Sequence, residues 1–100
     1  DVYKRQAKQR ARTMAWAITW EALKGQKFVP THYRVIWYFK GDPPDDDNVL
    51  TRCKYYKDGA CKAMKIDDGP LRCLGIDRVH DLTRAGQVEI VFERRDDENA

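Results

Sequence analysis

The stretch that decides the fold reads YRVIWYFKGDPPDDDN and covers residues 33–48. Residues 33–39 are β-branched and aromatic, which favours a strand. Apolar side chains fall on both alternating faces of this segment, so we expect a central strand that is covered on each side. The Gly-Asp-Pro-Pro sequence at 41–44 excludes both helix and ladder pairing, and it predicts a rigid loop at the end of the strand.

A helix is predicted over residues 48–64, with Asp46 or Asp47 as its N-cap. Its apolar residues recur at spacings of four and three, which is typical of a stripe that faces a core; they are Val49, Cys53, Tyr56, Ala60 and Met64. Gly59 lowers helix stability by roughly 1 kcal/mol relative to Ala. We therefore expect Gly59 to permit the close approach of another element.

A second, longer helix is predicted over residues 2–24, because no Pro or Gly interrupts them and Gly25 supplies a natural stop. Its expected apolar face contains Met14, Ala17, Ile18 and residues 20–23, with Ala7 and Ala11 extending it. Trp16 and Trp20 lie four residues apart and share a side of the helix. We expect them to be core contacts rather than a stacking platform for bases.

The remainder of the chain predicts a second acidic turn and two more strands. The acidic turn covers residues 66–70, a strand lies within residues 71–82, a turn covers 84–87 and a strand covers 88–92. Pairing these two strands as a hairpin is the simplest arrangement. Residues 94–100 form a charged, frayed tail. The predicted fold is thus α+β, with a small mixed sheet and two main helices packed on it.

Length and composition indicate one folded domain over residues 1–100. No apolar run approaches the roughly 20 residues of a membrane helix and no signal peptide opens the chain, so we expect a cytoplasmic protein without a membrane partner. Cys53, Cys61 and Cys73 form no C-x-x-C pair. We expect reduced, buried thiols rather than a zinc site.

The net charge of +3 hides an asymmetry along the chain. Five basic residues crowd the first twelve positions: Lys4, Arg5, Lys8, Arg10 and Arg12. Carboxylates concentrate instead at 42–47, 67–68 and 96–98. A basic arm beside an acidic pocket suits a polyanionic substrate that is handled through a metal. The alternative is an ordinary solvated helix face.

The acidic segments contain candidate metal ligands. Asp45 and Asp47 are two residues apart, so in an extended segment their side chains face the same way and can converge on one cation. Asp67 or Asp68 can supply a third ligand, and Mg²⁺ prefers such oxygen ligands. Lys54 lies about two helical turns (~10 Å) beyond Asp47, where its side chain could reach back to a phosphate. The alternative is that these carboxylates only cap a helix and solubilise turns.

Other chemistries lack support in the sequence. The acidic stretch has neither the glycine nor the glutamate of an EF-hand loop, and there is no glycine-rich phosphate loop. His32 and His80 stand alone, so we expect surface or strand residues rather than ligands or bases.

Four motifs follow the aromatic strand in order: D-x-D-N-V at 45–49, K-x-x-x-D-G at 54–59, I-D-D at 66–68 and V-E-I at 88–90. In this order they resemble the RusA family of Holliday junction resolvases, small endonucleases of bacteria and their prophages. The resemblance covers roughly residues 33–93. That family usually begins with a strand before its first helix, and we expect this strand to be missing from this sequence.

The resemblance implies a role for particular residues. The matching catalytic positions are Asp45, Asp47, Lys54 and Asp68, with the three aspartates as metal ligands. Asp67 is a possible substitute for Asp68, and Arg52 competes with Lys54 for the role of the helix lysine.

The resemblance also implies an activity and its partners. Such enzymes are homodimers that use Mg²⁺, which Mn²⁺ can replace, and they resolve four-way junctions by paired nicks in DNA recombination and repair. The basic residues of the first helix would then contact DNA phosphates. The alternatives are a non-catalytic nucleic-acid- or partner-binding module, and a nuclease that acts on flaps or plain duplex.

Overall fold

The computed structural model describes residues 1–42 and 46–96, and of residues 46–48 it describes the backbone alone. The chain divides into two compact units. The helical unit contains Asp1–Val29 and Arg52–Gly69, and the sheet unit contains Pro30–Thr51 and Pro70–Ala100. Two helices and a three-stranded mixed sheet make up the described chain, which confirms the predicted α+β class.

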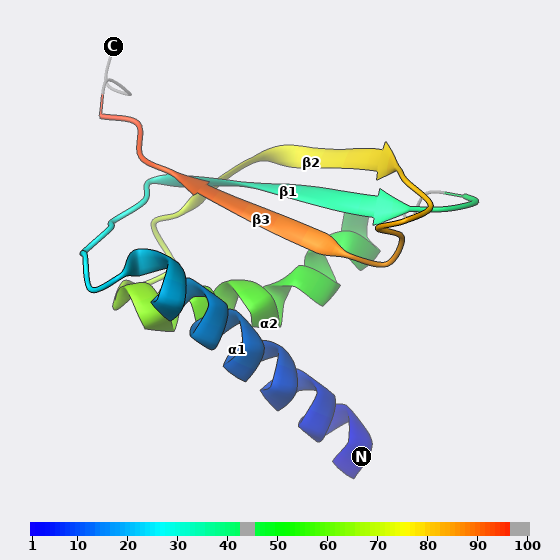
Figure 1. Ribbon diagram of the computed structural model, residues 1–100, viewed down its shortest axis with the longest axis horizontal. Coiled ribbons are helices and arrows are strands. Elements are labelled where there is room, and N and C mark those ends of the chain that lie inside the picture. The colour runs from blue at the N-terminus through cyan, green and yellow to red at the C-terminus, as the bar shows by residue number, and fades with distance from the viewer. Residues whose placement is uncertain (43–45, 97–100) are drawn as a thin grey trace. The chain divides into compact units, whose positions relative to one another are not determined.

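The sheet is built around β1 (His32–Phe39). Its strand order is β2-β1-β3, with β2 (Arg72–His80) parallel to β1 and β3 (Val88–Glu93) antiparallel to it (Figure 1). Val35 and Trp37 are buried on β1, as its apolar composition requires. The prediction that this segment is the central strand is confirmed.

The predicted hairpin between the last two strands is wrong, because β2 and β3 both pair with β1. The connection after β2 crosses the end of β1: the backbone N–H of Gly86 donates to the Tyr38 carbonyl at 2.9 Å, and that of Tyr38 donates to the Gln87 carbonyl at 3.0 Å. Across the β1–β3 pair, the Tyr38 hydroxyl donates to Glu89 at 2.8 Å. A connection as long as residues 81–87 allows this crossing, whereas a tight hairpin loop would not.

An irregularity in the β1–β2 pairing gives β2 an extra residue. Tyr33 pairs with Cys73, whereas Val35 pairs with Ile76. Gly75 within the irregular segment has a φ of 147°, a backbone conformation that favours glycine. Because β2 has β1 on one side only among the described strands, its side chains are more exposed, and Cys73 is exposed as well. The prediction that all three thiols are buried holds for Cys53 and Cys61 but is wrong for Cys73.

Helix α1 covers Val2–Leu23 in the helical unit. Asp1 caps it by accepting the Tyr3 N–H at 2.8 Å, and Lys24 ends it in the left-handed conformation just before Gly25. Its half-buried positions recur every four residues, at Ala11, Ala15, Thr19 and Leu23.

The predicted apolar face of α1 is therefore rotated from the observed one. Met14 and Ile18 were expected to face a core, but both are exposed. Trp16 and Trp20 were expected to be core contacts, and this is also wrong, because their side chains remain 39% and 49% exposed. The helix thus half-buries three small residues and Leu23, and it leaves Met14, Trp16, Ile18 and Trp20 accessible.

Helix α2 covers Asp46–Met64, so it begins two residues earlier than predicted. Asp46 and Asp47 consequently lie within its first turn rather than at the cap position. The predicted stripe is confirmed at four positions that are buried, Val49, Cys53, Ala60 and Met64, whereas Tyr56 is half-buried.

The two helices of the helical unit approach each other at Gly59. A Cβ built on Gly59 would overlap the carbonyl oxygen of Arg12 and would lie 2.9 Å from its carbonyl carbon. The expectation that Gly59 permits a close approach is confirmed, and the partner is the backbone of α1.

No helix within the described residues is long and apolar enough to cross a membrane. Of the predicted tail, Arg95 donates its backbone N–H to the Thr31 hydroxyl at 2.9 Å, and residues 97–100 lie outside the described part of the chain. His32 and His80 lie in β1 and β2, as predicted for strand residues.

Candidate functional site

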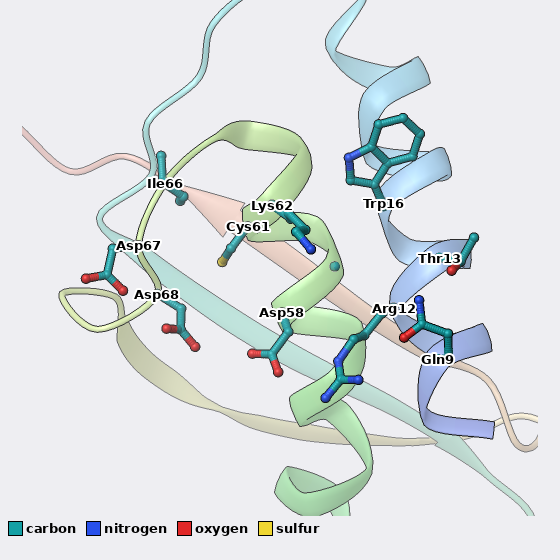
Figure 2. Close-up of a pocket in the computed structure, with 11 residues that line it drawn as sticks. Gln9, Arg12, Thr13, Trp16, Asp58, Cys61, Lys62, Ile66, Asp67 and Asp68 are labelled. Atoms are coloured by element: carbon teal, nitrogen blue, oxygen red, sulfur yellow. The ribbon is translucent and has the colours of Figure 1, made fainter. Parts of the chain in front are cut away.

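A hollow of about 750 Å³ lies in the helical unit where α1 and α2 converge. We call it the carboxylate hollow (Figure 2). Its charged lining consists of Asp58, Asp67, Asp68, Arg12 and Lys62. Its remaining lining includes Gln9, Thr13, Trp16, Cys61 and Ile66.

Three carboxylates among the described residues line the hollow. Asp58 comes from α2, whereas Asp67 and Asp68 come from the turn that follows this helix (Figure 2). Asp67 also stabilises the turn, since its Oδ1 accepts the Gly69 N–H at 3.1 Å. The turn thus places Asp67 and Asp68 in the same hollow as Asp58.

Two cations share this space. Arg12 extends from α1 towards Asp58, and Lys62 lies one helical turn beyond Asp58 on α2 (Figure 2). The Arg12 guanidinium also lies over the Tyr55 ring, 4.9 Å from its centroid, and the Lys8 ammonium lies 5.3 Å from the same centroid. Cation–π attraction to Tyr55 therefore helps to hold these α1 side chains against α2.

The Cys61 thiol lies among these charges. Burial, reinforced by the negative charge of Asp68 and more weakly by that of Asp58 and Asp67, raises the pKa of Cys61 to about 11. Lys57 acts in the opposite direction and lowers it. At neutral pH the thiol is protonated, so Cys61 is no nucleophile in the resting protein.

The structure brings together some of the predicted site residues. Asp67 and Asp68 both line the carboxylate hollow. Lys54 is exposed on α2 and is not part of the hollow's lining. Asp47 lies in the first turn of α2, but its side chain, like the whole of Asp45, falls outside the described part of the structure.

The predicted DNA-binding residues all lie on α1. Lys4, Arg5, Lys8, Arg10 and Arg12 are exposed there. A smaller hollow of about 520 Å³ lies among three of them, Arg5, Lys8 and Arg12, together with Tyr55. Basic side chains that line a concave surface suit a polyanion.

Asp58 and Trp16 are among the lining residues that were not assigned to a site from the sequence. Asp58 entered the sequence reading only as part of the motif at residues 54–59. Its neighbour Gly59 was the available signal, because a glycine that admits another helix also places adjacent side chains at the crossing. Trp16 was assigned to the core, yet it borders the hollow. The sequence did not show whether Trp16 faces a core or solvent, because two different faces of α1 satisfy the apolar spacing.

The donor set agrees in type with a hard divalent cation, since carboxylate oxygens are the ligands that Mg²⁺ prefers. Within residues 1–42 and 46–96, as the structure describes them, no three His, Cys, Asp or Glu side chains are grouped closely enough to hold a metal ion. The other predicted ligands, Asp45 and the side chain of Asp47, lie outside the described part of the chain.

Comparison with known proteins gives one relative. A protein of Xylella fastidiosa (strain Temecula1 / ATCC 700964), described as an uncharacterized protein, is 37% identical over 94 residues. The match covers 88% of this chain, which spans 58% of the relative's length. No family model matches the chain, and no solved structure matches it.

Proposed function

We propose that this chain is a metal-dependent DNA endonuclease that acts on branched DNA and resolves four-way junctions by paired nicks. The observation that carries the proposal is the carboxylate hollow, in which Asp58, Asp67 and Asp68 share a space with Arg12 and Lys62. Asp68 or Asp67 would hold a metal ion together with the predicted ligands Asp45 and Asp47, and the nearby cations suit a phosphodiester. The resemblance to RusA-type resolvases supports the same activity.

The proposed ligands are Asp45, Asp47 and Asp68, with Asp67 able to replace Asp68. Bound there, Mg²⁺ or Mn²⁺ would supply positive charge that offsets the charge developing on the phosphate. Arg12 would hold a substrate phosphate by paired hydrogen bonds, which the planar guanidinium suits. Lys54 would contact the scissile phosphate.

The basic half of α1 would bind the DNA backbone. Its five exposed cations carry no sequence information, and their contribution to affinity should fall as salt rises. The proposed enzyme works as a homodimer, because paired nicks in opposed strands require two active sites.

The experiment that tests the proposal is cleavage of an end-labelled four-way junction with Mg²⁺, Mn²⁺ or EDTA. A flap and a linear duplex of the same sequences are the comparison substrates. Symmetric nicks that occur in the junction alone, and only with a metal, are the expected result. Equal cutting of the flap or duplex would leave a nuclease but remove the junction preference, and no cutting with either metal would overturn the proposal.

One observation favours the alternative of a non-catalytic binding module. Helix α2 begins at Asp46, so Asp46 and Asp47 lie in its first turn, where a negative charge stabilises a helix by itself. Thermal unfolding separates the two functions. A metal site raises the melting temperature with Mg²⁺ or Mn²⁺, because only the folded chain holds the ligands together. Acidic residues that merely stabilise a helix give no such specific shift.

A further inference from the structure

Two tryptophans on α1 form an exposed stack. The rings of Trp16 and Trp20 are nearly parallel, at 9°, and their centroids are 5.5 Å apart. They are 39% and 49% exposed, even though indole rings bury large areas wherever a core accepts them. Helix α1 packs with small residues instead, so this pair is left available for a partner.

Each ring borders a different hollow of the helical unit. Trp16 lines the carboxylate hollow, and Trp20 lines a second hollow of about 260 Å³. Since one face of each ring is turned towards the other ring, the remaining face of each is the one that a ligand in its own hollow can meet. The stack therefore connects two places where a flat ligand can bind.

Cations flank the stack in both hollows. Arg12 and Lys62 line the first, beside the carboxylates of Asp58, Asp67 and Asp68. Lys27 and Lys65 line the second, whose described lining contains no carboxylate. An apolar protein segment would form no ion pairs with these four cations. A nucleic acid strand would, because it carries one phosphate for every base. Proteins bind unpaired strands with little sequence preference through aromatic side chains that lie beside basic ones, and the Trp20 hollow, with Lys27 and Lys65, has this composition.

We propose that Trp16 and Trp20 form a stacking platform for unpaired bases of a DNA strand whose phosphates lie against Arg12, Lys62, Lys27 and Lys65. The choice of DNA over another flat polyanion rests on the proposed function. In a continuous duplex each base is covered by its neighbours, whereas a single strand, or a branch point at which the protein opens the arms, offers base faces for stacking. The platform thereby gives the chain a means of preferring branched or single-stranded DNA over duplex.

The test uses the full chain and three probes of equal length: a 12-nucleotide oligothymidylate, the same backbone without bases, and a 12-base-pair duplex. Binding is measured by fluorescence anisotropy for the unaltered chain and for a Trp16→Ala/Trp20→Ala variant. Met14→Ala/Ile18→Ala is the matched control, because it removes two other exposed apolar side chains from the same helix. Circular dichroism and melting temperature establish that both variants are folded.

The tryptophan variant should bind oligothymidylate about tenfold more weakly or worse, because each stacked base contributes substantially to affinity. Its affinity for the abasic probe and its salt dependence should stay unchanged, since the phosphate contacts are retained. The control variant should bind all three probes like the unaltered chain. Equal affinity of the tryptophan variant for oligothymidylate would overturn the platform, and so would an equal loss on the abasic probe.

Two further outcomes separate this inference from the proposed function. If the chain cleaves junctions and the tryptophan variant binds oligothymidylate normally, the platform falls and the nuclease stands. If the chain never cleaves but loses oligothymidylate binding in the tryptophan variant alone, the platform stands and the nuclease falls. Should the tryptophan substitutions instead abolish self-association, measured by sedimentation, while oligothymidylate is not bound at all, the occupant is a second copy of the chain and the platform is overturned.

Discussion

Gly59 illustrates how one missing side chain organises the helical unit. A glycine inside a helix costs about 1 kcal/mol relative to alanine, so intrinsic propensity alone would exclude it. Here the bare Cα lets the Arg12 backbone come close, and this contact sets the two walls of the carboxylate hollow. The cost in helix propensity is offset by the packing of the two helices.

We predict that Gly59→Ala destabilises the chain by about 1–3 kcal/mol, although alanine is the better helix former. The new methyl group meets backbone atoms of Arg12, which cannot rotate away as a flexible side chain would. Urea unfolding measures the change. Gly69→Ala is the control, because its added Cβ would have nothing nearer than 3.6 Å, and a Gly59→Ala chain as stable as this control would contradict the predicted close approach.

The Cys61 thiol makes stability depend on alkaline pH. Its pKa is about 11 in the folded chain against 9.0 ordinarily, so between these values the unfolded chain loses the thiol proton and the folded chain retains it. The unfolded state then binds fewer protons, and the free energy of unfolding falls as pH rises from 9 towards 11.

We predict this loss at no more than about 1.4 kcal/mol per pH unit for a single proton, with full stability retained below pH 9. Urea unfolding at pH 8, 9, 10 and 11 measures it. Tyr38, whose pKa is raised above 10.0 chiefly by its hydrogen bond to Glu89, acts in the same direction at the upper end of the range. Cys61→Ala should flatten the dependence of the free energy of unfolding on pH between pH 9 and 10. If this dependence is unchanged in the variant, groups other than Cys61 cause it.

At the scale of elements, α1 has three kinds of surface. Small residues at positions 11, 15 and 19, followed by Leu23, are half-buried, basic residues crowd its first half, and large apolar side chains remain exposed. The spacing of apolar residues predicted an amphipathic helix but not its orientation. More than one face satisfied spacings of three and four, and only the close approach at Gly59 favours the face with the smallest side chains.

We predict that replacing Lys4, Arg5 and Lys8 with glutamine weakens DNA binding and flattens its dependence on salt. Each lost phosphate contact lowers the slope of log affinity against log salt by about 0.9 on duplex DNA, so the triple variant should lose up to about 2.7. The affinity for DNA is measured at salt concentrations between about 50 and 200 mM, and the slope is taken from these values. A triple variant at Lys40, Arg72 and Arg94 removes the same charge from the sheet unit, and equal losses in both variants would place the DNA surface outside α1.

The strands show where local patterns stop being informative. Composition identified β1 and β3 as strands and β1 as central, because β-branched and aromatic side chains dominate them. Composition did not predict which strands pair with β1. A hairpin was the simplest pairing for two consecutive strands. It failed because the turn at residues 81–87 hydrogen-bonds to the end of β1 in addition to its own internal bonds, and β3 then pairs with β1.

At the scale of the whole molecule, the candidate site was partly predictable. Asp67 and Asp68 were alternatives for one predicted ligand position, and both line the same hollow. The contributions of Asp58 and Trp16 depend on how two helices pack, which is a long-range property that residue spacing does not encode. The roles of Asp45 and Asp47 stay predictions from the sequence.

We predict that Asp47→Asn lowers junction cleavage by about 100-fold or more while folding and junction binding persist. The substitution keeps the shape of the side chain and removes the charge that a cation needs. Cleavage and anisotropy assays on the same preparation measure both properties. Asp42→Asn, which changes an exposed carboxylate shortly before it, should cleave normally, and nicking by Asp47→Asn at the normal rate would remove it from the proposed site.

The position of β1 in the sheet also has a consequence for biosynthesis. Both of its partners follow it in the chain, so the central strand leaves the ribosome with two open edges and keeps at least one until β3 has been made. At about 5–20 residues per second, the interval from Phe39 to Glu93 lasts roughly 3–10 seconds. During that time an apolar strand with unpaired backbone groups is available to other nascent chains. Expression yield should therefore depend on translation speed and on chaperones that shield β1 more than on the stability of the finished fold.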